Sequence, residues 1–180
     1  MVDETLRKLE DQIKKFGDPW LNETLDQYAE KIGHVAMSWS RMQEHLGQLF
    51  AYLVSPLHPM RGWAAWHAIA SDLAQRAMLA AVVRETYEDP KDPMRVEIEW
   101  MLGRIAALLD NRNGAVHVAF QMGIGDTEVT MVPIDQTGNP RAKKLAGREL
   151  RDDFEFTHHR IAQVSLHAQA LVPFLLPPPL

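Results

Sequence analysis

The chain has 180 residues, of which 46% are hydrophobic and 24% are charged, as is typical of one globular domain with its own core. It contains no cysteine, which excludes disulfides, cysteine nucleophiles and thiolate metal sites. The formal net charge of -5 argues against a general nucleic-acid coat, because nonspecific phosphate binding depends on an excess of Lys and Arg. The acidic start and the lack of an apolar run of about 18 residues predict a cytoplasmic protein without a membrane span.

Three helices are predicted in the first half of the chain. Apolar residues at helical spacing indicate a lead-in helix at residues 2–16, within an N-terminal segment 1–21. A long helix is expected at about 22–54, with Asn22 as its N-cap and an almost heptad stripe of apolar side chains. A second long helix is expected at about 60–87, where small residues suggest close helix packing. Its packed side is expected to carry Trp63, Trp66, Ala70, Leu73, Ala74, Ala77 and Ala81.

The second half adds two helices and one strand pair. A helix with an apolar face should stop at Asn113–Gly114, a strong stop signal. The period then changes to alternation, which indicates a β-hairpin. The predicted elements are a helix at about 94–112, a hairpin at about 118–133, a loop at 135–148, a last helix at about 149–175 and a proline-rich tail at 176–180.

Amphipathic helices joined by short breaks can bury their apolar stripes only against one another. The sequence therefore predicts an all-α fold, an up-and-down helical bundle with a small β-hairpin inserted before the last helix. We expect this domain to span residues 22–175.

The end of the helix predicted at about 94–112 carries the most specific pattern in the chain. Arg112 is followed directly by Asn113 and, five positions on, by His117, which makes an R-x4-H motif. A guanidinium is a fixed cation suited to phosphate, and an imidazole exchanges protons near neutral pH. Together these groups predict chemistry on a phosphodiester without a metal.

This motif and its setting resemble the HEPN superfamily (higher eukaryotes and prokaryotes nucleotide-binding domains), helical bundles marked by R-x4-6-H with a polar residue after the arginine. The likeness extends to the W-x4-E run from Trp39 to Glu44, although Val118 stands where many relatives have glycine. It implies an endoribonuclease that needs no metal or cofactor, with His117 as acid/base, Arg112 as phosphate clamp and Asn113 as their polar partner. It further implies a role as a toxin or defence component, with a possible cognate antitoxin protein.

The chemistry itself argues for a dimer. Cutting RNA through its 2'-hydroxyl needs a base, an acid and a cation for the phosphate, whereas one chain offers one motif histidine. A homodimer with a twofold axis between the motifs would supply two histidines and two arginines, and HEPN ribonucleases are similar in this respect.

Two other interpretations stay open. In the first, the chain is a HEPN-like bundle that does not cleave RNA and serves nucleotide binding or protein interaction. In the second, it is a helical bundle unrelated to that family. In the second case Arg112 would complement the dipole of its helix, Asn113–Gly114 would cap it and His117 would be a partly buried strand residue.

A basic segment follows the hairpin and is a candidate for holding an RNA backbone. Its members in the predicted loop are Arg141, Lys143, Lys144 and Arg148, and Arg151 follows them. The histidines at 158, 159 and 167 are expected on the surface, because adjacent side chains point to different faces of a helix and no metal-ligand spacing occurs. We expect no metal site.

Overall fold

The computed structural model describes residues 4, 6–8, 10–11, 14, 18–124, 129–135 and 138–176. The predicted lead-in helix at 2–16 falls largely outside these residues. The predicted turn of the hairpin is only partly described, and so is the proline-rich tail.

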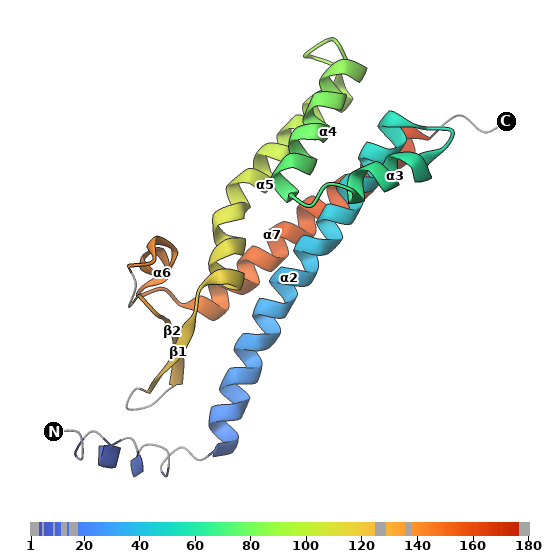
Figure 1. Ribbon diagram of the computed structural model, residues 1–180. Helices are drawn as coiled ribbons and strands as arrows, with labels where there is room; N and C mark the ends of the chain where they lie inside the picture. Colours follow the sequence, from blue (N-terminus) through green and yellow to red (C-terminus); the bar gives the residue numbers. More distant parts are fainter. Residues whose placement is uncertain are drawn as a thin grey trace.

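The described residues form an all-α bundle with one two-stranded sheet, as the sequence predicts (Figure 1). The three longest described helices alternate in direction along the chain, and the hairpin lies where the second of them ends and close to the start of the third (Figure 1). The elements are α2 (Asp18–Val54), α3 (Pro59–His67), α4 (Asp72–Thr86), α5 (Pro93–His117), β1 (Phe120–Ile124), β2 (Val129–Pro133), α6 (Pro140–Leu145), α7 (Leu150–Leu171) and the 3-10 helix η1 (Val172–Leu175).

The core forms around α2, most of whose apolar stripe is buried as predicted. Leu25 is 40% exposed, and Ile32 and Leu53 are half-buried. α2 begins at Asp18, so the prediction that Asn22 caps it was wrong. The fully buried side chains on α2, α5 and α7 include Val35, Met42, Leu46, Leu49, Ile98, Met101, Ile105 and Ile161. Three helices therefore share one apolar core.

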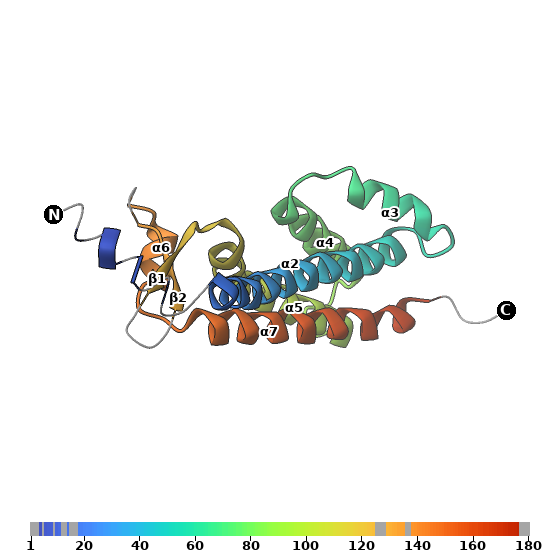
Figure 2. The same cartoon turned by 90° about the horizontal axis from the view of Figure 1, so that it is seen from below.

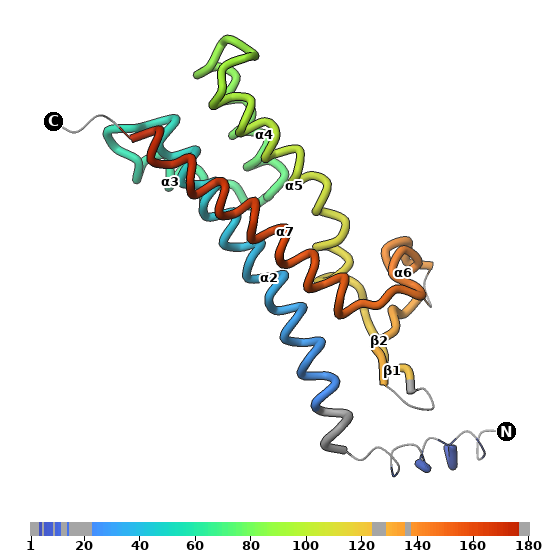
Figure 3. Tube along the Cα trace, turned by 180° about the vertical axis from the view of Figure 1, so that it is seen from behind, coloured from blue at the N-terminus to red at the C-terminus, as the bar shows by residue number. Residues whose placement is uncertain are grey.

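α2 and α7 lie side by side and run in the same direction (Figures 2 and 3). Polar contacts cross between them at successive heights: Lys31 to Glu155, Ser38 to His158 and His45 to Ser165. These six residues are called the α2–α7 interface below.

The prediction of a single helix at about 60–87 was wrong, because the chain breaks between α3 and α4. Ser71 caps α4 by accepting a hydrogen bond from the Ala74 amide at 3.4 Å. The buried Gln75 amide donates at 3.0 Å to the carbonyls of Trp66 and Ile69. These contacts satisfy backbone groups that an unbroken helix would have paired internally.

The prediction of which side of α4 packs against the bundle was also wrong. Leu73 is 68% exposed, and Ala77 and Ala81 are exposed as well. The buried residues of α4 are instead Gln75, Arg76, Leu79 and Val83. The break allows this outcome, since it frees α4 to rotate relative to α3, where Trp66 is buried as expected.

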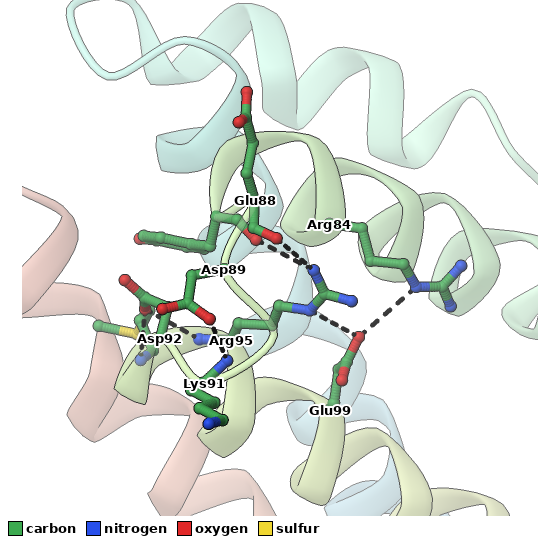
Figure 4. A network of polar contacts seen from close by, with 9 residues as sticks. Arg84, Glu88, Asp89, Lys91, Asp92, Arg95 and Glu99 are labelled. Atoms are coloured by element: carbon green, nitrogen blue, oxygen red, sulfur yellow. Dashed lines mark hydrogen bonds and ion pairs between the residues drawn. The ribbon is translucent and has the colours of Figure 1, made fainter.

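Polar contacts hold the turn between α4 and α5 (Figure 4). Asp92 caps α5 by accepting from the Met94 amide at 2.8 Å. Arg95 donates to the carbonyls of Tyr87 and Glu88, and it pairs with Glu99 at 3.3 Å. Backbone amide and carbonyl groups of the turn are therefore hydrogen-bonded to side chains, and the turn orients α5 antiparallel to α4.

α5 continues to His117, so the predicted stop at Asn113–Gly114 was wrong. Gly114 is buried against Leu145 of α6, and a Cβ at Gly114 would lie 3.4 Å from the Leu145 side chain. That distance is ordinary van der Waals contact, so the helix continues through Gly114 although the packing there does not require a glycine. α6 lies in the region predicted as loop and begins at the Asn139 cap, and the described strands pair antiparallel with Phe120 opposite Pro133.

Candidate active site

The three motif residues lie together at the C-terminal end of α5. Arg112 Nη1 donates to Asn113 Oδ1 at 3.0 Å and lies 3.2 Å from His117 Nε2. A guanidinium can only donate, so Nε2 of a neutral His117 accepts in this arrangement. His117 is exposed, and Arg112 and Asn113 are half-buried. The motif is therefore open to solvent on its histidine side.

The continuous helix contradicts two parts of the interpretation in which the motif residues have only structural roles. Asn113 and Gly114 are interior residues of α5, so they do not cap it, and Val118 occupies the C-cap position. His117 is the last helical residue and is exposed, so it is not a partly buried strand residue.

The Trp39 side chain of α2 packs against Arg112. It is 2% exposed, and the Arg112 guanidinium carbon lies 5.3 Å from the centre of the Trp39 rings. The indole Nε1 donates to Asp72 Oδ2 at 2.8 Å, which fixes the ring against the start of α4. The indole thus offers Arg112 a cation–π contact in a fixed orientation.

Arg76 of α4 is a second cation against the same indole, with its guanidinium carbon 5.6 Å from the ring centre. Arg76 is 7% exposed. Burial lowers its pKa, Asp72 opposes that shift, and the positive charge of Arg112 lowers the pKa further. We call Trp39, Asp72, Arg76 and Arg112 the two-arginine cluster.

Two guanidinium atoms of this cluster are buried without a hydrogen-bond partner among the described residues: Arg76 Nη1 and Arg112 Nε. The only carboxylate of the cluster, Asp72, already accepts from Trp39. Two cations and one anion leave one positive charge in excess. Such an arrangement suits an anionic ligand chemically, because guanidinium groups match phosphate oxygens in geometry and charge.

The basic segment lies on and beside α6, next to α5. Arg141, Lys143, Lys144 and Arg148 are all exposed. Lys144 pairs with Asp110 of α5 at 2.7 Å, and Arg148 pairs with Asp153 at 2.6 Å. The segment is thus near the helix that carries the motif, and two of its cations are also engaged with carboxylates.

The other candidate histidines lie apart from the motif. His158 is half-buried and hydrogen-bonded to Ser38, whereas His159 is exposed. His167 is half-buried and contacts Glu97 at 3.1 Å. Within the described part of the chain, no three His, Asp or Glu side chains are grouped so that they could hold a metal ion.

Sequence reasoning missed Asp72 and Arg76. The signal was present, since residues 72, 76, 79 and 83 follow helical spacing and the last two are apolar. The alanine-rich side of α4 obscured it. Glu44, the last residue of the W-x4-E run, is not part of this cluster. Its Oε2 lies 3.6 Å from His67 Nε2 of α3.

Comparisons with protein-family models, curated proteins and solved structures found no match. No helix in the described ranges combines the length and apolar character needed to cross a membrane.

Proposed function

We propose that this protein is a metal-independent endoribonuclease of HEPN type, with Arg112, Asn113 and His117 in its active site. The observation that carries the proposal is the contact of one Arg112 nitrogen with both Asn113 and His117. The contact supports the proposal because it brings together a guanidinium suited to phosphate and an imidazole that can exchange protons.

In this mechanism the RNA phosphate takes over the Arg112 nitrogen that now contacts His117. The Nε2 lone pair of His117 then becomes free to take the proton of the 2'-hydroxyl, whose oxygen attacks the neighbouring phosphorus. The bond from phosphorus to the departing 5'-oxygen breaks, and that oxygen must receive a proton. The products are a 2',3'-cyclic phosphate and a free 5'-hydroxyl.

The second proton-transfer group is best supplied by a second copy of this chain. A twofold axis beside the exposed His117 would bring a second imidazole to the same phosphate, with one histidine as base and the other as acid. We therefore propose a homodimer whose active site combines both motifs. A toxin or defence role, controlled by an antitoxin protein, fits a ribonuclease of this kind.

The alternative is a HEPN-like module that binds nucleotides or proteins without cleaving RNA. Val118 after the motif histidine and the net charge of -5 favour this alternative. The two-arginine cluster is compatible with it, because phosphate binding does not require cleavage.

The first test is incubation of single-stranded RNA with wild type, His117→Ala and Arg112→Ala, each with and without a chelator. Loss of one acid/base group should lower the cleavage rate by about 10²- to 10⁴-fold. Wild-type cleavage should survive the chelator and leave 2',3'-cyclic ends. Unchanged circular dichroism of His117→Ala would show that the loss is chemical, since His117 is exposed.

Matched controls are His58→Ala and Arg61→Ala, two exposed residues at the start of α3 that should leave cleavage unchanged. Equal residual cleavage by wild type and both motif variants would indicate contamination and favour the binding module. Cleavage that the chelator abolishes would contradict a metal-independent reaction. Light scattering that shows a monomer at micromolar concentration would contradict the composite site.

A further inference from the structure

Arg76 is the feature that the proposed mechanism leaves unused. It is a buried cation with Nη1 unpartnered within the described structure, and it shares the indole of Trp39 with Arg112. A buried donor without a partner costs folding free energy, and a second cation nearby adds to that cost. Asp72 and the Trp39 ring offset part of the cost of burying Arg76, but they leave Nη1 without a hydrogen-bond partner.

The surroundings also limit what the missing partner can be. Asp72 is the first residue of α4, where the helix dipole favours a negative charge, and its Oδ2 accepts from Trp39. Asp72 is thus stabilised without Arg76. The excess positive charge of the cluster is left for an anion from outside.

We propose that Arg76 and Arg112 together form a phosphate-binding site within one chain, with Trp39 as the platform that holds both guanidinium groups. The ligand class is a phosphodiester of single-stranded RNA. The proposal rests on the proposed function for this choice of ligand. The phosphate approaches from the side of the exposed His117 and half-buried Arg112. Because Arg76 Nη1 is buried, the Arg76 side chain turns towards the phosphate, whose oxygens then supply the partner that Nη1 lacks.

This assignment changes the division of work in the dimer. Each chain would bind its phosphate through Arg76 and Arg112. The partner subunit would then need to supply only the second histidine. Arg76 is then a phosphate-binding residue that sequence motifs of the R-x4-H kind do not include.

The test measures binding and stability separately. The probe is a 2'-O-methyl RNA oligonucleotide, which cannot be cleaved through its 2'-oxygen. We expect Arg76→Met to bind it about tenfold more weakly or worse, because a hydrogen bond to a charged group is lost. The same variant should have a higher Tm than wild type without ligand, because an unpartnered buried cation is gone.

Arg76→Lys keeps the charge beside Asp72 and is the second variant if Arg76→Met fails to fold. It should also bind more weakly, because an ammonium lacks the planar pair of donors. In wild type, the oligonucleotide should shift the indole N–H NMR signal of Trp39, identified among the five tryptophans by its loss in Trp39→Phe. Exposed Arg61→Met is the matched control and should bind as wild type does.

Wild-type affinity in both Arg76 variants would overturn the proposal, and so would a wild-type protein that does not bind the oligonucleotide. These failures are distinguishable from failure of the proposed function. Binding that depends on Arg76, with no cleavage of unmodified RNA, would leave the phosphate site intact and remove the ribonuclease. Cleavage that depends on His117, with binding indifferent to Arg76, would do the reverse.

Discussion

The α2–α7 interface and the two-arginine cluster both place polar side chains between packed helices, but they treat them differently. At the interface each polar group has a partner on the facing helix: Lys31 contacts Glu155 at 3.0 Å, and His45 Nδ1 lies 2.9 Å from Ser165 Oγ. In the cluster Arg76 Nη1 and Arg112 Nε are buried without partners among the described residues.

The difference separates a structural from a functional use of polarity. Paired groups between helices fix their register and satisfy buried donors and acceptors. Unpaired cations lower stability and are retained where a ligand completes them, since local rules are broken mainly at functional sites. If this comparison holds, variants of the cluster and of the interface should change different quantities.

The largest effect is expected at Trp39, where the comparison is sharpest. Trp39→Ala removes a buried indole that contacts both arginines and Asp72. We expect the free energy of unfolding to fall by about 3–5 kcal/mol, as for other buried tryptophans truncated to alanine. Urea denaturation followed by circular dichroism would measure this change.

Trp39→Phe is the matched variant, because it keeps an aromatic face for the arginines and loses only the indole N–H donor to Asp72. Its loss of stability should be clearly smaller, and its affinity for uncleavable RNA should stay closer to that of wild type. Equal losses in the two variants would mean that the hydrogen bond to Asp72, and not the aromatic platform, is what matters at Trp39.

The fold was largely predictable because its signals are periodic. The stripes of α2, α5 and α7 repeat at helical spacing over many residues, and the hairpin alternates with period two. The split between α3 and α4 was not predictable in the same way. It depends on Ser71 and Gln75 satisfying backbone groups across the break, which is a tertiary effect.

The candidate site was predictable only where its residues are close in sequence. Arg112, Asn113 and His117 fall within six positions and match a motif. Arg76 and Asp72 reach the motif through the packing of α4 against α2, and the alanines of α4 pointed to the wrong face. Gly114 also misled, because Asn113–Gly114 is a common helix stop whereas α5 continues through it to His117.

A smaller effect is expected at the α2–α7 interface on lowering the pH. His158 lies against His34, with ring centres 5.1 Å apart, and contacts Ser38 at 3.1 Å. Burial lowers the pKa of His158 below its usual value of 6.5. A hydrogen bond with the backbone of His34 opposes this shift, the charges of His34 and His159 lower the pKa further, and Glu155 raises it. The folded state therefore disfavours the protonated imidazole.

The sign of the pH effect follows from this shift. Below a pH of about 6.5 the unfolded chain takes up a proton at His158 before the folded chain does, so stability falls as the pH drops through the lowered pKa. Tm should decrease between pH 7 and pH 5, and His158→Gln should reduce that decrease by a few °C, on the order expected for a domain of this size. His58→Gln is the control, since His58 is exposed at the start of α3. An identical pH dependence in wild type and His158→Gln would show that the interface does not resist protonation at this position.

The smallest effect on stability is expected at Lys144, which belongs to neither region but lies beside the motif helix. Its ion pair with Asp110 joins side chains that are 64% and 69% exposed, and exposed pairs contribute little. Tm of Lys144→Gln should equal that of wild type. If the basic segment holds the RNA backbone, the oligonucleotide should nevertheless bind more weakly, and the slope of log K against log salt should fall by about 0.7 for one lost phosphate contact. Lys91→Gln, an exposed change at the α4–α5 turn in Figure 4, should alter neither quantity. A salt slope that Lys144→Gln leaves at the wild-type value would confine RNA binding to the two-arginine cluster and the motif, because charge beside α6 would then have no contact with the phosphate backbone.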